Sequence, residues 1–393
     1  MKKKFNIKRW LRPLMGLGIG ALIGVAFAAS LFAVPVIREF LKGPMSDSGM
    51  LVFMLYWFGA MAIAVVAVFA QIILHEAGHL VAGLLSGYRV VSFRVANLMV
   101  VRRDDGLHFG RFSIAGTGGQ CLMEPREQTL AEAEQMPYAL YLAGGVVANA
   151  LVSLVAIVVL VVGNAGVLCS CVMVMLALSG MYLAITNGVP MRIGGVANDG
   201  DNIRTLRRDH RARQLLWVQL KVNALYTRGV MYRDMPDEWF EVEADADMSN
   251  YLYATIVAMH SSQAIERHDF DAAYNDLMRL HRASGLIELL RREADCELLL
   301  PAVMLRRTRW EVERLMSGEG EQYARLYAQY MLSRRVTLYV FERFVRRNVE
   351  AAAKEAEAIR RVAANYPSVG ESRSSLEMLE YLEGLNDEDY AID

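Results

Sequence analysis

Two histidines and a glutamate lie close together inside a long apolar stretch of the sequence. His75 and Glu76 directly follow the apolar residues 72–74, and His79 comes three residues after Glu76. Residues four positions apart share one face of a helix, so both imidazoles are expected to point toward one place. Two imidazole nitrogens on one face make up half of a tetrahedral zinc site, and a neighbouring carboxylate can take a proton from a water molecule on the metal. The spacing therefore indicates zinc-dependent hydrolysis with Glu76 as the general base.

A third protein ligand is expected elsewhere in the chain, because a catalytic zinc ion usually has three. The segment 186–201 follows the last apolar stretch and contains glycines and a proline, which end a helix. Asp199 lies in this segment and is predicted to be the third ligand. Asp201 is the alternative ligand, and a simple turn at residues 198–200 is the alternative role for the segment.

Four apolar stretches long enough to cross a membrane must position these residues. About 20 apolar residues span the hydrocarbon core. The predicted spans cover residues 13–37, 50–86, 137–163 and 167–186. Ionisable groups at the centre of a spanning helix cost roughly 2.5 to 3.5 kcal/mol each on insertion scales, so the polar groups of the second span need a compensating partner. A bound metal ion reached by water provides one.

Positive charges predict how these spans are oriented. The segment 1–12 carries six Lys or Arg residues, whereas the loop 163–166 between the third and fourth spans carries no charge. Positively charged segments stay in the cytoplasm, so the N-terminus is predicted to be cytoplasmic. Four spans return the chain to the same side, so the C-terminus is predicted to be cytoplasmic as well, in a multi-pass protein of the cell membrane. Arginines that follow the fourth span are expected to rest on anionic lipid headgroups: Arg207, Arg208, Arg211 and Arg213.

A β-hairpin is predicted over residues 89–114, between the second and third spans. Its strands would be Arg89 to Val101 and Leu107 to Ile114, joined by a turn at residues 104–106. The exposed edge of such a hairpin could hold a substrate peptide extended by strand addition. The alternative is a hairpin that only lies on the membrane surface.

The C-terminal half has a different composition and is predicted to be all-helical. Apolar residues recur at helical spacing among many Arg and Glu residues. The stretch 264–274 resembles the turn of a tetratricopeptide-type helical hairpin. A protein partner is one expectation for this region, whereas nucleic acid is not, because aromatic interleaving and known motifs are lacking.

Taken together, the motifs resemble those of the site-2 protease family of intramembrane zinc metalloproteases. The first family signature is H-E-x-x-H at 75–79, and the second combines N-x-x-P at 187–190 with Asp199 and Gly200. A third element, a Gly-Pro-x-x-Asn segment, is similar to residues 145–149, where Val146 replaces the proline. The resemblance covers about residues 50 to 205.

This resemblance implies a zinc endopeptidase that cleaves membrane-spanning or membrane-associated proteins. The orientation predicted from the charges, together with the position of 75–79 past the middle of the second span, places the cleavage near the cytoplasmic leaflet. The resemblance also implies Zn²⁺ held by His75, His79 and Asp199, a re-entrant hairpin at 89–114, and a substrate or oxyanion role for Asn149 and Asn187, for which helix-helix hydrogen bonding is the alternative. Two other functions remain open. One is a catalytically silent membrane adaptor with a helical partner-binding domain, and the other is a prenyl-protein-processing type of membrane protease.

The predicted fold class is therefore an α-helical integral membrane protein with four transmembrane helices, a β-hairpin between the second and third, and an all-α cytoplasmic C-terminal domain. Three parts follow along the chain: a basic cytoplasmic segment at 1–12, a membrane-embedded metalloprotease domain at 13–204, and a cytoplasmic helical domain at 205–393.

Overall fold

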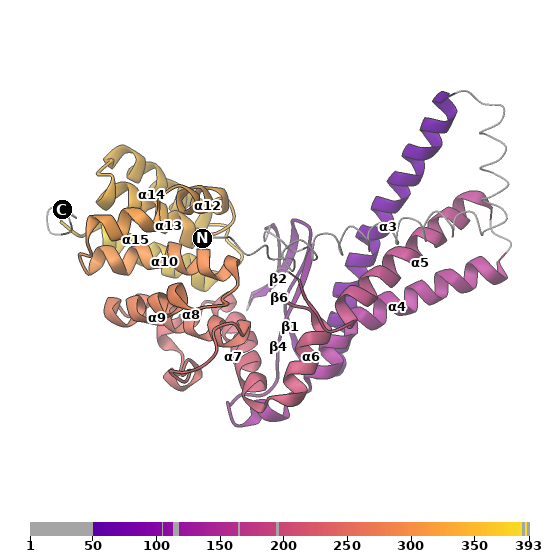
Figure 1. Ribbon diagram of the computed structural model, residues 1–393, viewed down its shortest axis with the longest axis horizontal. Helices are drawn as coiled ribbons and strands as arrows, with labels where there is room; N and C mark the ends of the chain where they lie inside the picture. The colour runs from indigo at the N-terminus through magenta and orange to yellow at the C-terminus, as the bar shows by residue number, and fades with distance from the viewer. Residues whose placement is uncertain are drawn as a thin grey trace, which may run out of the picture. The chain divides into compact units, whose positions relative to one another are not determined.

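The computed structural model describes residues 50–103, 105–112, 118–163, 166–193, 196–386 and 390. The predicted first span at 13–37 and the basic segment at 1–12 lie outside these residues. Three described helices are long and apolar enough to cross a membrane, and they coincide with the other three predicted spans (Figure 1). They are α3 (Met50–Leu85), α4 (Tyr138–Val162) and α5 (Val167–Gly188).

These three helices are apolar outside and polar inside. Large apolar side chains such as Phe58, Val66 and Val161 are exposed, whereas Gln71 and Asn149 are completely buried. Exposed apolar surface is stable against lipid tails, and polar groups in hydrocarbon must bond to one another. The pattern is therefore that of a membrane-embedded helical bundle.

A four-stranded antiparallel sheet lies between α3 and α4 in the sequence. Its strand order is β3-β2-β1-β4, so β3 and β4 form its edges. The strands are β1 (Arg89–Val95), β2 (Leu98–Arg103), β3 (Gly106–Arg111) and β4 (Gly119–Glu124).

The sheet differs from the predicted two-stranded hairpin at two places. The predicted hairpin turn after Arg103 is confirmed, because β2 pairs with β3 and Arg103 lies opposite Gly106. The predicted single strand 89–101 is wrong, since the chain turns at Ala96, whose φ of 52° is rare for a residue with a side chain. Strand β4 was not predicted, and it completes the sheet by pairing with β1.

The rest of the described chain is helical apart from a short hairpin, β5 (Arg192–Ile193) and β6 (Val196–Ala197). This agrees with the predicted helical C-terminal half. The helices are α6 (Asp199–Arg208), α7 (His210–Arg228), α8 (Tyr251–Glu266), α9 (Phe270–Arg282), α10 (Glu288–Met304), α11 (Arg309–Leu315), α12 (Glu319–Tyr327), α13 (Leu332–Val340), α14 (Val349–Ala363) and α15 (Val369–Glu383).

The chain divides into two compact units. One contains the described residues up to Gly78 together with Gly145–Asn187, and the other contains His79–Gly144 together with Gly188–Asp393. The sheet therefore belongs to the same unit as the C-terminal helices.

A buried ion pair joins the sheet to α7 within this second unit. Lys221 Nζ lies 2.8 Å from Glu124 Oε1, and Arg228 Nη1 lies 2.6 Å from Glu124 Oε2. Burial disfavours the carboxylate, but the bonds from Arg228 and Lys221 outweigh burial and lower the pKa of Glu124. The Tyr366 carbonyl accepts a further hydrogen bond from Arg103 Nη2, at 2.8 Å, and this bond connects the end of β2 to the segment between α14 and α15.

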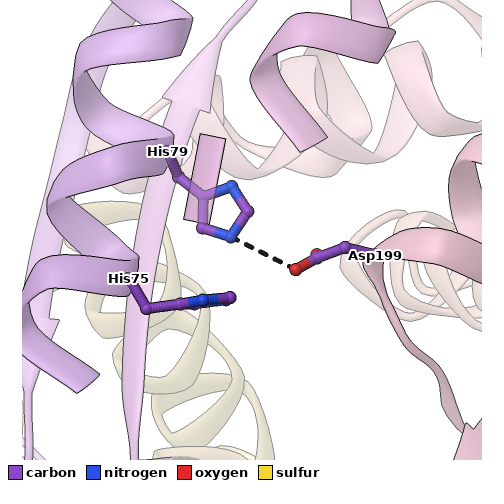
Figure 2. A group of neighbouring side chains, drawn as sticks. All are labelled: His75, His79 and Asp199. Carbon is purple, nitrogen blue, oxygen red and sulfur yellow. Dashed lines mark ion pairs between the residues drawn. The ribbon is translucent and has the colours of Figure 1, made fainter. Parts of the chain in front are cut away.

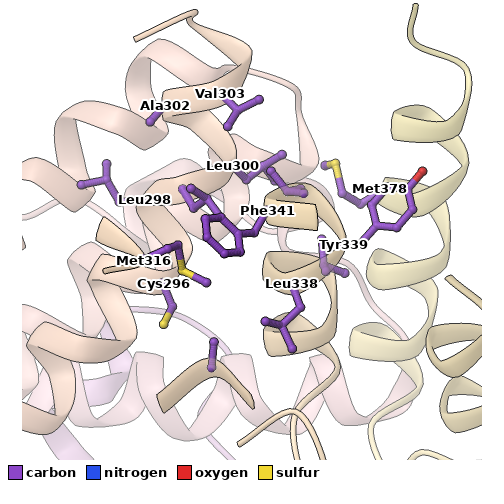
Figure 3. Packing of buried hydrophobic residues seen from close by; sticks show 14 of the residues in the cluster. Cys296, Leu298, Leu300, Ala302, Val303, Met316, Leu338, Tyr339, Phe341 and Met378 are labelled. Carbon is purple, nitrogen blue, oxygen red and sulfur yellow. The ribbon is translucent and has the colours of Figure 1, made fainter. Parts of the chain in front are cut away.

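Interlocking apolar side chains hold the C-terminal helices together. Figure 3 shows Leu300 of α10 and Phe341 beyond α13 in one cluster, with Met378 of α15 on its other side. Leu299 and Val340 in this cluster are completely buried. Burial of this kind contributes about 1.5 to 3 kcal/mol per large side chain, which is enough to stabilise helices that are too short to be stable alone.

Candidate metal centre

Three side chains that can bind a metal ion converge in the structure. His75 and His79 lie one turn apart on α3, and Asp199 is the first residue of α6 (Figure 2). One ligand atom from each residue lies within 4.8 Å of the other two. His79 is buried, whereas His75 and Asp199 are half-buried. The predicted convergence of residues more than 100 positions apart is therefore present.

The spacing of these atoms suits a zinc ion. His79 Nε2 lies 3.5 Å from Asp199 Oδ2. Two ligands at about 2.1 Å from a tetrahedral zinc would be about 3.4 Å apart. Two imidazoles and one carboxylate also form the donor set of open catalytic zinc sites. The residues therefore fit a three-ligand zinc site with small side-chain adjustments.

A chain of hydrogen bonds fixes the orientation of His75. Its Nδ1 lies 2.6 Å from Asn149 Oδ1 on α4. The Asn149 amide donates both hydrogens to Gln71, at 2.8 Å to the carbonyl and 2.7 Å to Oε1. The amide oxygen of Asn149 must therefore accept from a protonated His75 Nδ1, which leaves Nε2 outside this bond and able to bind a metal ion.

Gln71 connects this chain of bonds to the third membrane helix. Its Nε2 donates to the Leu176 carbonyl of α5 at 2.9 Å. Gly180 allows the close approach, because a Cβ there would lie 2.4 Å from Gln71 Nε2 and 2.3 Å from Ser153 Oγ. Small residues at such contacts let membrane helices pack closely. The three helices α3, α4 and α5 are thus joined by hydrogen bonds that end on His75.

A backbone group orients the second histidine in the same way. His79 Nδ1 lies 2.8 Å from the Tyr141 carbonyl, so this nitrogen carries the proton and Nε2 faces Asp199. The Tyr141 hydroxyl donates to the Cys121 carbonyl of β4 at 2.9 Å. Tyr141 therefore links the histidine to the sheet.

Asn198 holds Asp199 in place. It caps α6 by accepting a hydrogen bond from the Asp201 amide at 2.9 Å, and its Nδ2 donates to the Val189 carbonyl at 2.6 Å. Gly200 brings the first turn of α6 against the end of α5, because a Cβ at this position would lie 2.2 Å from the Gly188 oxygen. In Asn198-Asp199-Gly200, the first residue therefore caps the helix, the second belongs to the His-His-Asp cluster and the third allows the close contact with Gly188.

The remaining predicted residues lie in different surroundings. Asp201 pairs with Arg192 at 3.2 Å and is not in the three-residue cluster. Asn187 Nδ2 donates to the Leu183 carbonyl of its own helix at 2.9 Å. Glu76 is half-buried on α3, directly after His75. Among the other described histidines, His260 and His281 each pair with an aspartate.

Three residues of this centre were missed in the sequence. Gln71 could have been found from the sequence, because a polar residue one turn before His75 in a spanning helix needs a hydrogen-bond partner. Asn198 had a weaker signal, because Asn is a preferred helix cap and precedes Asp199 directly. Tyr141 acts through its backbone carbonyl, and no residue type predicts that contact.

Comparison with known proteins agrees with this geometry. The sequence profile of peptidase family M50, the site-2 protease family, matches residues 63–368, which include both histidines and Asp199. Neither the curated proteins nor the solved structures contained a match. The matched region covers most of the chain, and the family is one of membrane metallopeptidases. The chain therefore belongs to peptidase family M50.

Proposed function

We propose that this metallopeptidase is a zinc endopeptidase that cleaves membrane-embedded substrates, with His75, His79 and Asp199 as the metal ligands. The observation that carries the proposal is the convergence of the three ligand atoms within 4.8 Å. The two Nδ1 bonds support it, because a second bond of this kind is typical of histidines that bind a metal.

Glu76 is the proposed general base. When bound, zinc would polarise the scissile carbonyl and make a water molecule more acidic. Glu76 accepts a proton from the attacking water while the water oxygen adds to the carbonyl carbon of the substrate. The carboxyl group then delivers this proton to the leaving amine as the carbon–nitrogen bond breaks. Its position next to His75 on α3 supports this role.

Asn149 and Gln71 are proposed to position His75. The sequence resemblance gave Asn149 a substrate or oxyanion role, but its amide oxygen and both hydrogens are engaged by His75 and Gln71. A fully bonded amide at a completely buried position favours a positioning role. Asn187 remains a candidate for binding substrate, although its amide now donates to Leu183.

The outer edge of the sheet is the proposed place for an extended substrate. Strand β3 is an edge strand, and Leu107 and Phe109 on it are 62% and 81% exposed. An edge can hold a peptide by backbone hydrogen bonds, whereas charges on an edge discourage pairing. The double substitution Leu107→Asp and Phe109→Asp should lower cleavage while leaving the zinc content unchanged.

The substitution Glu76→Gln tests the proposal. Membranes that contain the wild-type protein should show new peptide termini in membrane proteins, and those with Glu76→Gln should lack them although the variant still binds zinc. The exposed Glu350→Gln serves as a control that should cleave normally. If a zinc-loaded Glu76→Gln protein produced the same new peptide termini as the wild type, Glu76 would be excluded as the base. A wild-type protein without zinc and without new termini would favour the silent adaptor.

A further inference from the structure

A cavity of about 500 Å³ lies where the chain leaves its last membrane helix. Its wall is formed by Gly188 and Pro190 at the end of α5, and by Gly200 and Ile203 on α6. Arg204, Arg207 and Arg208 complete the lining. The cavity thus has an apolar wall and a basic rim.

The arginines and the apolar wall share one face of α6. Ile203 and Arg204 lie three and four residues after Gly200, and Arg207 lies four and three residues after these two, so the four residues share one face of the helix. Leu206, on another face, is almost completely buried. Helix α6 therefore turns the face with Ile203 and the arginines toward the cavity and directs Leu206 toward the core.

The position of the cavity is fixed by the end of a membrane span. Gly188, which lines it, is the last residue of the candidate span Val167–Gly188. The next residue, Val189, is 50% exposed, and Val196 in the following hairpin is 43% exposed. A span ends where the hydrocarbon core meets the lipid headgroups, so these exposed apolar side chains and the cavity are expected at the level of the headgroups.

Two of the rim arginines form no ion pair with the residues that the structure describes. Among the residues that the structure describes, no carboxylate lies within ion-pair distance of Arg207 or Arg208, and both side chains are exposed. Arg204 has only a 4.0 Å contact with Asp201, which also pairs with Arg192. The rim therefore carries a net positive charge, because no described carboxylate pairs with Arg207 or Arg208.

The other two arginines expected at headgroups are engaged elsewhere. Arg211 donates to the Glu241 carbonyl at 2.6 Å and lies 3.5 Å from Glu243. Arg213 donates to the Leu206 carbonyl at 2.6 Å and covers the ring of Tyr138. The four-arginine cluster of the sequence is thus divided into two structural residues and two that remain available to a ligand.

We propose that this cavity binds the phosphate of an anionic phospholipid. Guanidinium groups bind phosphate through paired hydrogen bonds, and the apolar wall at Ile203 and Pro190 suits the glycerol and upper acyl carbons. A zwitterionic headgroup would bring its own cation next to the arginines, so a net negative lipid is favoured. Since Asp199 begins the same helix, the lipid would bind beside a residue of the metal centre.

The full-length protein in a neutral detergent is the material for the test. Native mass spectrometry would follow binding of dioctanoyl phosphatidylglycerol, with dioctanoyl phosphatidylcholine and inorganic phosphate as separate arms. The double variant Arg207→Gln and Arg208→Gln should bind phosphatidylglycerol about 30-fold more weakly, on the basis of two lost surface cations. The Arg207→Lys and Arg208→Lys pair should lose less, because it keeps the charge but not the paired hydrogen bonds.

A matched control removes the same charge elsewhere. Arg282 and Arg361 are exposed and have no described ion-pair partner, so replacing both by Gln should leave lipid binding unchanged. Equal phosphatidylglycerol binding by the wild type and the Arg207→Gln, Arg208→Gln protein would overturn the proposal. Equal binding of phosphatidylcholine, or phosphate that competes as strongly as lipid, would also overturn it. Binding is measured here without proteolysis, so the outcome is independent of the proposed enzymatic activity.

Discussion

The Nδ1 atom of His75 lies 2.6 Å from Oδ1 of Asn149, a residue 74 positions later in the chain. This contact joins two membrane helices beside the His-His-Asp cluster. It sets the proton on Nδ1, so the nitrogen that faces the cluster is Nε2. Asn149 is held in turn by Gln71, so the ring of His75 is fixed through its Nδ1 side, away from the nitrogen that faces His79 and Asp199.

Removal of this contact should weaken metal binding. The substitution Asn149→Ala is expected to lower zinc affinity about 10- to 100-fold, as is usual when an outer partner of a ligating histidine is lost. Competition with a chelator of known affinity measures the change. Ser153→Ala, one turn further along α4, removes another buried polar group and should keep the affinity. An unchanged affinity in Asn149→Ala would show that Asn149 does not position His75.

The two aspartates of α6 should behave differently. Asp199→Ala is expected to reduce zinc affinity by more than the 10- to 100-fold typical of outer partners, because a direct ligand is lost. Asp201→Asn should retain zinc, since Asp201 pairs with Arg192 rather than with the histidines. Zinc per chain, measured by elemental analysis of the purified proteins, separates the two. Zinc loss in Asp201→Asn alone would assign the third ligand to Asp201 instead.

A methyl group at Gly200 should disturb the position of Asp199. In Gly200→Ala the new Cβ would lie 2.2 Å from the Gly188 oxygen, so the first turn of α6 must move. Forced packing of this kind costs about 1 to 3 kcal/mol. We expect a lower melting temperature and weaker zinc binding, both measured in detergent. Gly59→Ala in α3 is the control and should lower neither quantity, because among the described residues no atom outside its own stretch of helix lies within 4 Å of the new Cβ.

The buried carboxyl of Glu371 should make stability depend on pH. Burial raises its pKa from the ordinary value of 4.5 to about 7, and Glu297 adds to the shift while Tyr366 and Arg334 oppose it. Between these two values the unfolded chain has released a proton that the folded chain still holds. The free energy of unfolding therefore falls as pH rises from about 4.5 to about 7, by about 3 kcal/mol for a shift of this size.

Glu371→Gln tests this dependence, because it keeps the shape but cannot ionise. Denaturant unfolding of the wild type and the variant at pH 5 and pH 8 should show a smaller loss of stability with rising pH in the variant. The exposed Glu350, whose pKa is lowered by Lys354, provides a control substitution by Gln that should not reproduce this effect. Parallel pH profiles for wild type and Glu371→Gln would contradict the expected titration.

The sequence determined those parts of the protein that depend on short spacing. His75, Glu76 and His79 are fixed on one side of a helix by the four-residue interval, and the bounds of three spans follow from apolar length alone. The turn between β2 and β3 could also be predicted, because Asp-Gly is a strong local hairpin signal. The turn at Ala96 could not, because alanine rarely adopts a positive φ and carries no such signal.

Contacts between distant segments were decided only by the tertiary structure. The sequence made Asn149 conspicuous as a polar residue in an apolar helix, but its partners His75 and Gln71 depend on how α3 and α4 pack. Likewise, four arginines after the last span look alike in the sequence, and only folding engages Arg211 and Arg213. Residue type and local interval set what a side chain can do, whereas the packing of helices sets which partner it meets, because that packing depends on the whole set of buried surfaces.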